Sequence, residues 1–222
     1  MRPRFAGRLG PADAVTAANA GLGFCAVAAA TTGEVALGAR LVLLAAIADG
    51  LDGLVARRWG GSPVGHHLDA LADVASFGVA PATLVFAAWY APTLSAATAV
   101  AVGVPALYVA VAVVRLALYT ELDGGGCETE GVPTTLAGTV LAAGALSGVP
   151  AWALVVGTAA ACVLMVVPVT YPDLLDRDAL GMGAIQAGAV LLPDAARAAF
   201  PRALLVASLA YLCLAPRFYW RE

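Results

Sequence analysis

The sequence predicts an all-α integral membrane protein, a bundle of about eight transmembrane helices, and three observations support this fold class. First, 61% of the 222 residues are hydrophobic and 12% are charged, whereas soluble domains carry about 25% charged residues. Second, the mean hydropathy is +0.87. Third, Arg115 is the only charged residue between Val74 and Tyr119, and the stretch from Val132 to Pro172 has none. Uncharged stretches of this length are typical of helices that lie in lipid.

Turn residues divide the chain into the segments that we expect to span the membrane. A spanning helix needs roughly 20 apolar residues, with a range of about 17 to 25. Turn-forming residues interrupt the apolar sequence at 31–33, 60–63, 91–92, 124–126, 148–150 and 171–173. The predicted helices are therefore 12–30, 34–57, 64–91, 94–119, 132–148, 150–170, 179–193 and 200–217.

Each segment carries its own evidence. The first follows three arginines, but Asp13 and Asn19 interrupt it and no cleavage site follows, so we expect a retained helix rather than a signal peptide. The second and third segments hold most of the acidic residues expected within the membrane, and the fourth segment holds a single arginine. The fifth and sixth are barely separated and the seventh is short, so six or seven spans are alternatives to eight. We expect a single domain over 1–222 without internal repeats.

The arginines predict the orientation of the bundle, because cytoplasmic loops carry an excess of positive charge. The chain has no lysine. With the N-terminus in the cytoplasm, nine arginines fall on the cytoplasmic side and three on the other. The nine are Arg2, Arg4, Arg8, Arg57, Arg58, Arg115, Arg177, Arg217 and Arg221, and the three are Arg40, Arg197 and Arg202.

Charge and cysteine content exclude other classes of protein. The net charge of −3 leaves no basic surface, so we expect no nucleic-acid partner. The four cysteines, Cys25, Cys127, Cys162 and Cys213, are not paired at metal-ligand spacing. We therefore expect neither a disulfide framework nor a zinc site.

Two pairs of aspartates carry the strongest chemical signal. Asp49 and Asp52 are three residues apart, and Asp69 and Asp73 are four apart, so each pair shares one helix face. A carboxylate at the centre of a membrane helix costs about 2.5 to 3.5 kcal/mol. A water-filled cavity, a cation, or both must offset this cost. Because oxygen-only ligand sets favour hard cations, the four aspartates are expected to hold Mg²⁺ or Mn²⁺ near the cytoplasmic surface.

A simpler interpretation of these aspartates is helix capping and pairing with arginine. Asp49 and Asp52 are close enough in sequence to pair with Arg57 and Arg58, and Asp69 stands near a helix start. For a single aspartate this interpretation is as good as the metal site. Four aspartates at this spacing favour the metal site.

The chain resembles the CDP-alcohol phosphotransferases. Their pattern, D-x2-D-G-x2-A-R-x8-G-x3-D-x3-D, is matched at Asp49, Asp52, Gly53, Ala56, Arg57, Gly65, Asp69 and Asp73, except that seven residues rather than eight separate Arg57 from Gly65. The run 68–82, together with Arg115-Leu116-Ala117 and Gly131-Val132-Pro133, resembles the phosphatidylserine synthase and archaetidylserine synthase branch. The resemblance implies a six-helix core, here with two further helices, and commonly a homodimer.

The resemblance also implies a reaction and a role for each residue. A CDP-linked lipid, CDP-diacylglycerol or CDP-archaeol, would lose CMP as the hydroxyl of L-serine attacks the phosphorus attached to the lipid. Asp49, Asp52 and Asp69 would bind metal, and Asp73 would be the general base and also touch metal. Asp52, Gly53, Ala56, Arg57 and Gly65 would frame CMP. The enzyme would be a multi-pass protein of the plasma membrane with its site facing the cytoplasm.

Two features outside the motif have competing interpretations. Arg115 would bind the lipid phosphate or the serine carboxylate through its planar guanidinium; alternatively, it extends to the membrane interface. His66 and His67 occupy variable positions, and we expect solvated residues at a helix start. Thr16 and Asn19 either line the polar cavity or make hydrogen bonds between helices. The segment 121–130 is expected to be a loop without chemistry.

Rival functions remain open from sequence. The acceptor is L-serine or, alternatively, glycerol phosphate, inositol phosphate or another alcohol; few basic residues stand near the site, which favours serine. A small ion transporter that uses intramembrane aspartates is a rival of a different class. It would place acids near the middle of several helices, whereas here they lie at one end of two adjacent helices.

Overall fold

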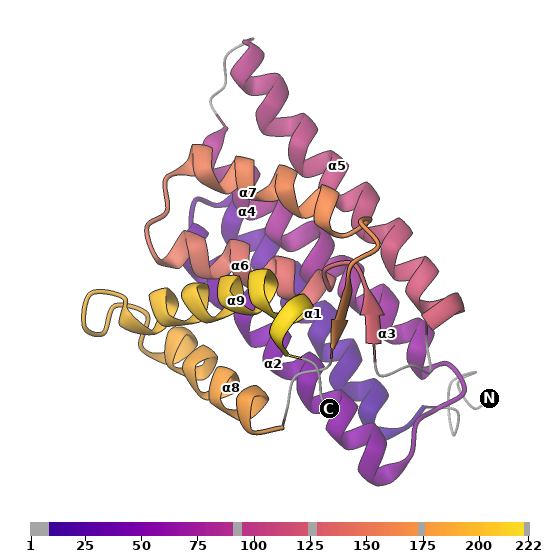
Figure 1. Ribbon diagram of the computed structural model, residues 1–222. Helices are drawn as coiled ribbons and strands as arrows, with labels where there is room; N and C mark the ends of the chain where they lie inside the picture. Colours follow the sequence, from indigo (N-terminus) through magenta and orange to yellow (C-terminus); the bar gives the residue numbers. More distant parts are fainter. Residues whose placement is uncertain (1–8, 91–94, 124–127, 173–175, 220–222) are drawn as a thin grey trace, which may run out of the picture.

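The computed structural model describes residues 9–90, 95–123, 128–172 and 176–219, and it is almost entirely helical (Figure 1). The predicted all-α architecture is confirmed, and each of the eight predicted segments contains helix in the part that the structure describes. The α-helices are α1 (Pro11–Thr31), α2 (Val35–Trp59), α3 (Gly65–Asp73), α4 (Ala80–Trp89), α5 (Ala96–Leu118), α6 (Thr134–Leu146), α7 (Ala151–Leu164), α8 (Asp176–Leu191) and α9 (Ala199–Phe218). Two π-helical segments are η1 (Val74–Val79) and η2 (Tyr119–Asp123), and two strands are β1 (Glu128–Glu130) and β2 (Thr170–Pro172).

Four helices are long and apolar enough to cross a membrane: Pro11–Thr31, Gly65–Trp89, Ala96–Glu121 and Ala199–Phe218. The second of these joins α3, η1 and α4 into one continuous rod. α2 is equally long, at 25 residues, but it carries five charged side chains. α6 and α7 are apolar but have 13 and 14 residues. At 1.5 Å per residue they are shorter than the hydrocarbon core of a bilayer.

Local sequence explains most helix ends. Pro11 opens α1 at the first helical position, where a missing N–H costs nothing. The Ser95 hydroxyl accepts a hydrogen bond from the Thr98 N–H at the start of α5, and prolines precede both α6 and α7. Gly60 ends α2 with φ at +85°, a conformation that favours glycine. The predicted turns at 91–92 and 124–126, Asp173, the arginines at 2, 4, 8 and 221, and Cys127 lie outside the described residues.

Two apolar clusters hold the helices together, and α6 contributes to both of them. The first joins α1, α2, η1, α4, α6, α8 and α9 around Leu43, Phe77, Leu84 and Leu204. The second joins α4, α5, α6, α7 and α9 around Tyr108, Leu141 and Leu154. Full burial of a Leu or Phe side chain contributes roughly 1.5 to 3 kcal/mol, so these two clusters fix the rotation of each helix about its axis. Cys25, Cys162 and Cys213 are free thiols.

A short β-ribbon orders part of the segment that the sequence predicted to be a loop. β1 pairs antiparallel with β2, with Thr129 opposite Tyr171. Directly after β1, Gly131 has φ at +72°, and a Cβ at that position would lie 2.3 Å from the Met165 carbonyl oxygen. The prediction for 121–130 was therefore wrong in part, because pairing with a distant strand is invisible in a local polar sequence. α6 begins at Thr134, shortly after β1, and packs against α2.

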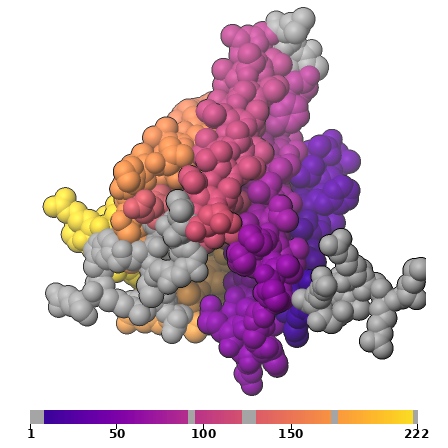
Figure 2. Space-filling view, turned by 90° about the vertical axis from the view of Figure 1, so that its right-hand side faces the viewer, coloured from indigo at the N-terminus to yellow at the C-terminus, as the bar shows by residue number. Residues whose placement is uncertain are grey.

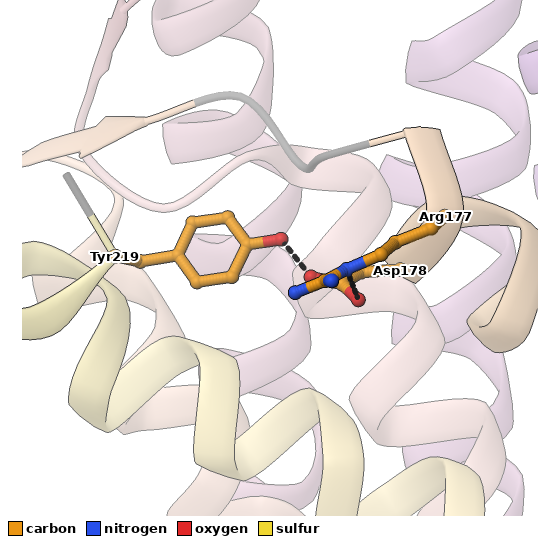
Figure 3. A network of polar contacts seen from close by, with 3 residues as sticks. All are labelled: Arg177, Asp178 and Tyr219. Atoms are coloured by element: carbon orange, nitrogen blue, oxygen red, sulfur yellow. Dashed lines mark hydrogen bonds and ion pairs between the residues drawn. The ribbon is translucent and has the colours of Figure 1, made fainter. Parts of the chain in front are cut away.

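The helix pair α8 and α9 lies side by side at one edge of the bundle (Figure 1). α8 packs against α2, and the Nε of Arg40 donates to the Val190 carbonyl over 2.7 Å. At the opposite end of the pair, the Tyr219 hydroxyl at the end of α9 donates to Asp178, which also pairs with Arg177 (Figure 3). Contacts at both ends therefore hold the pair in place.

Candidate active site

Three of the four predicted aspartates converge on one point. Asp49 lies in the C-terminal half of α2, and Asp69 and Asp73 lie one turn apart on α3. Each offers a carboxylate oxygen, and the three oxygens lie within 4.8 Å of one another. The turn at 60–64 connects α2 to α3, which packs against α1, and the surface of this connection protrudes at the lower end of the face seen in Figure 2. Side chains of α2 and α3 therefore create the cluster.

The hydrogen bonding of these carboxylates fits a divalent cation. Asp69 Oδ1 and Asp73 Oδ1 are buried and have no hydrogen-bond partner among the described residues. Asp49 accepts one long hydrogen bond, 3.4 Å, from the Thr135 hydroxyl of α6. Buried carboxylate oxygens without partners are costly, and like charges this close repel. Three oxygen ligands with spare lone pairs suit Mg²⁺ or Mn²⁺.

Asp52 has a different neighbourhood from Asp49, although they share a helix. Its carboxylate accepts a 2.7 Å hydrogen bond from the Thr16 hydroxyl of α1, and its side chain is buried. It does not belong to the three-carboxylate cluster. The three-residue spacing predicted a shared face, but Asp49 turns toward α6 and Asp52 toward α1. The two carboxylates therefore line neighbouring cavities. We call these the metal-side cavity and the α1-side cavity.

The metal-side cavity has a volume of about 630 Å³ and is open to solvent on one side. Three aspartates, one arginine and several hydroxyl groups face it, and the main contributors are Asp49, His66, Asp69, Asp73, Arg115, Tyr119, Thr120, Thr134 and Thr135. Arg115 is 7% exposed, and its guanidinium lies 5.7 Å from the centre of the Tyr119 ring. Arg115 thus lines the cavity instead of extending outward.

The α1-side cavity, of about 300 Å³, holds most of the residues predicted to frame CMP. Gly53, Ala56 and Gly65 line it with Asp52, and Asp69 lines both cavities. Its small side chains leave the backbone accessible to a bound group. Arg57 is exposed and is not among the lining residues, so its contact with a phosphate stays a prediction.

Asp13 ties the turn between α2 and α3 to the start of α1. Its Oδ1 accepts a 3.0 Å hydrogen bond from the Ser62 hydroxyl, and its Oδ2 accepts one of 2.6 Å from the Gly10 N–H. A Cβ on Gly65 would lie 3.5 Å from the same carboxylate. The turn that is one residue shorter than the family pattern is thus held by a side chain of another helix.

The structure adds residues to the site that the sequence argument missed. Thr134 and Thr135 enter from α6, and Tyr119 and Thr120 from η2, directly after α5. Two adjacent threonines after Pro133, at the start of an uncharged helix, were a weak signal for them. His66 was expected to be solvated; it is exposed, yet it lines both cavities, with its ring 3.9 Å from that of His67.

Thr16 and Asn19 behave differently on the same helix. Thr16 bonds to Asp52, as described above. Asn19 is fully buried, its carbonyl accepts a 2.8 Å hydrogen bond from the Ser76 hydroxyl, and both polar atoms of its side chain are without a partner in the part of the chain that the structure describes. Thr16 therefore contributes to the site, and the Asn19 backbone joins α1 to η1.

Comparison with known proteins identifies the class to which this fold and site belong. A family profile described as CDP-alcohol phosphatidyltransferase matches residues 10–170. The chain therefore belongs to the CDP-alcohol phosphatidyltransferase family. The match covers the carboxylate cluster and both cavities, and it ends before α8. Membership of a transferase family gives no support to the ion-transporter alternative.

Individual relatives point to one branch of the family. The chain is 33% identical over 143 residues to the archaetidylserine synthase of Methanothermobacter thermautotrophicus, covering 61% of this chain and 58% of that protein. It is 39% identical over 108 residues to the CDP-diacylglycerol–serine O-phosphatidyltransferase of Mycobacterium leprae and 36% identical to that of Mycobacterium tuberculosis, covering 48% of this chain in each case. These matches span 34% and 36% of the mycobacterial proteins.

Proposed function

We propose that this protein transfers the lipid phosphoryl group of a CDP-linked lipid to the hydroxyl of L-serine and releases CMP. The observation that carries the proposal is the cluster of Asp49, Asp69 and Asp73, with unpaired carboxylate oxygens, inside a cavity that also holds Arg115. The donor is CDP-diacylglycerol or CDP-archaeol. The names of the relatives support serine as the acceptor.

Each step of the transfer has a residue suited to it. Asp73 takes the proton of the serine hydroxyl while the serine oxygen forms a bond to the lipid-bearing phosphorus. The bond from that phosphorus to the bridging oxygen breaks, and CMP leaves with the electron pair. Bound Mg²⁺ or Mn²⁺, held by Asp49, Asp69 and Asp73 with Asp52 beside them, would neutralise the charge that develops on the diphosphate. Gly53, Ala56 and Gly65 admit the nucleotide, and Arg57 reaches its phosphate.

Arg115 is suited to bind the carboxylate of the acceptor or the phosphate of the lipid. It is buried in the cavity wall, where a guanidinium binds a planar anion more strongly than at the surface. Apart from His66, it is the only basic side chain among the described residues that line this cavity. A phosphorylated acceptor carries an additional charge and would need further cations, so a single arginine favours serine.

The proposed function also suggests where the protein lies in the cell and how it assembles. We propose that the chain forms one domain over 1–222 in the plasma membrane, with the site on the cytoplasmic side. In this position a soluble amino acid and a nucleotide-linked lipid reach the same cavity. Membrane lipids surround the exposed apolar side chains of α5 and α9, and a homodimer is the proposed assembly.

An acceptor screen tests the proposed function. Purified protein, CDP-diacylglycerol or CDP-archaeol, and Mn²⁺ or Mg²⁺ are incubated with each alcohol, and CMP release is measured. We expect release with L-serine, none after chelation with EDTA, and weakened Mn²⁺ binding in Asp49→Asn but not in Asp178→Asn, an aspartate outside the cavities. Release with glycerol phosphate or inositol phosphate but not with serine would contradict the serine assignment.

A further inference from the structure

A third cavity adjoins the metal-side cavity on the side of α8 and α9. It has a volume of about 270 Å³ and shares Pro133 and Thr135 with the metal-side cavity. Because Thr135 also bonds to Asp49, one α6 side chain lies between the carboxylate cluster and this third cavity. We call it the α8-side cavity.

The α8-side cavity extends from the site toward the interior of the bundle. Ala46 lies one turn before Asp49 on α2, and Thr139 lies one turn beyond Thr135 on α6. At its far end, Gln186 of α8 donates a 2.7 Å hydrogen bond to the Leu43 carbonyl, and Leu43 belongs to the central apolar cluster. A group attached to the reacting phosphorus can therefore extend from the metal site into this cavity.

The lining of this cavity is uncharged. Its apolar part comes from Ala46, Leu136 and Met182 with two prolines. Four of its five polar side chains already make hydrogen bonds within the protein: Thr135 to Asp49, Gln186 to Leu43, Tyr171 to Leu212 and Tyr211 to Pro172. No charged residue among the described residues lines it. A zwitterion such as serine has no counter-charge there, whereas a hydrocarbon chain has many apolar contacts.

We propose that the α8-side cavity takes up the first part of a hydrocarbon chain of the CDP-linked lipid, and that α8 and α9 thereby select among donors. This inference rests on the proposed function, since it assumes a lipid donor. The three residues from the helix pair are Met182, Gln186 and Tyr211, and all three lie beyond the family match, which ends at residue 170. Chain selection would thus come from helices added to the shared family core.

The position of this helix pair is well defined, as a selective wall requires. Tyr171 and Tyr211 face each other with ring centres 6.2 Å apart, and their hydroxyls bond to backbone carbonyls across the ribbon and α9. Beyond them, Tyr219 packs edge-on against Tyr211 and donates to Asp178 of α8 (Figure 3). These contacts join α8, α9 and β2 around the cavity.

A pair of tryptophan variants on α8 tests the inference. Met182→Trp fills the cavity, whereas Leu180→Trp adds the same ring to a side chain that is 75% exposed. With a long-chain CDP-lipid, we expect Met182→Trp to lower kcat/KM about tenfold by removing chain contacts, and Leu180→Trp to change it little. With CDP-glycerol, which has no chains, both variants should match the wild type. An equal loss with both donors would overturn the proposal.

A binding measurement keeps the test independent of turnover and of folding defects in the tryptophan variant. In a background without other cysteines, the thiol of Met182→Cys is alkylated with a maleimide. We expect long-chain CDP-diacylglycerol to slow the labelling, and CDP-glycerol or L-serine to leave it unchanged. Protection by serine alone would assign the cavity to the acceptor and overturn the proposal. Protection by the lipid in a protein that releases no CMP with any acceptor would refute the proposed function alone.

Discussion

At the scale of single residues, the site combines carboxylates that have different partners. Asp49, Asp69 and Asp73 each offer a carboxylate oxygen that could bind a metal ion, while Asp52 accepts a hydrogen bond from the Thr16 hydroxyl. The family pattern treats the four as one motif, but the packing separates a cluster of three from a fourth carboxylate that is fixed to α1. Substitutions at these positions should therefore have different effects.

We expect Asp73→Asn to lower the rate of CMP release with serine by about 10² to 10⁴, the usual contribution of a general base. Asparagine keeps the shape of the side chain but accepts no proton at neutral pH. Single-turnover release of CMP measures the effect. Asp194→Asn serves as the control, since Asp194 is exposed in the connection between α8 and α9 and lines none of the three cavities. Wild-type rates in Asp73→Asn would contradict the role of base.

Thr16→Val should weaken catalysis through Asp52 without removing a carboxylate. The 2.7 Å hydrogen bond to Asp52 is lost, and a hydrogen bond to a charged group contributes about 1.5 to 3 kcal/mol, so we expect a fall in kcat/KM of about tenfold or more. Thr31→Val is the matched control on α1, because Thr31 is exposed and bonds only to backbone carbonyls of its own helix. Equal rates in the two variants would show that the bond is not needed.

At the scale of elements, α1 approaches the continuous helix formed by α3, η1 and α4 closely, and this contact decides where Asp73 lies. The six-residue π-helical segment η1 follows Asp73 directly; such segments often occur at functional sites. Gly23 of α1 packs against this segment, and a Cβ there would lie 2.8 Å from the Ser76 hydroxyl and 2.9 Å from the Ala75 carbonyl carbon. The rod is thus set against α1 where a side chain has no room.

We expect Gly23→Ala to destabilise the protein by roughly 1 to 3 kcal/mol, the usual cost of overpacking, and to lower activity because Asp73 moves with η1. Thermal unfolding in detergent and CMP release measure the two effects. Gly21→Ala is the control on the same helix, since nothing lies within 4 Å of its added Cβ, and alanine is a better helix former. A stable, fully active Gly23→Ala protein would contradict this account of the contact.

At the scale of the whole molecule, the structure brings the chemical groups to one end of the bundle. The turn at 60–64, the end of α5, the start of α6 and the β-ribbon all lie near the carboxylate cluster (Figure 1). This arrangement is compatible with the alternating topology expected from the arginines. Both apolar clusters lie along the lengths of the helices, and the cavities lie at this end of the bundle.

Thiol labelling tests the orientation. In a cysteine-free background, Pro63→Cys places a thiol on the exposed turn between α2 and α3, and Glu34→Cys places one on the exposed turn between α1 and α2. We expect a membrane-impermeant maleimide to label Glu34→Cys in intact cells, and to label Pro63→Cys only after permeabilisation. The reverse pattern would place the site on the outer side and contradict the arginine argument.

Local sequence patterns were sufficient to predict most of the helices. Helix bounds agree with the predicted segments to within a few residues for α1 and α9, because apolar length, proline and glycine act locally. The largest differences are at the sixth segment, where α7 ends at Leu164, and in the region 121–130, where β1 pairs with β2 from forty residues further along the chain. Strand pairing at that distance depends on the packing of α5 and α7, which no local pattern records.

Residue types and spacings within single segments were enough to predict an all-α membrane fold, the aspartate motif and its likeness to one family. The packing of the helices was needed to show that Asp52 bonds to Thr16, that Thr135 meets Asp49 across 86 positions, and that Arg115 faces the cavity. It also decided that α8 and α9 enclose a cavity beside the site. The physical reason is that the rotation of a helix about its axis is set by burial of its apolar side chains against several other helices at once.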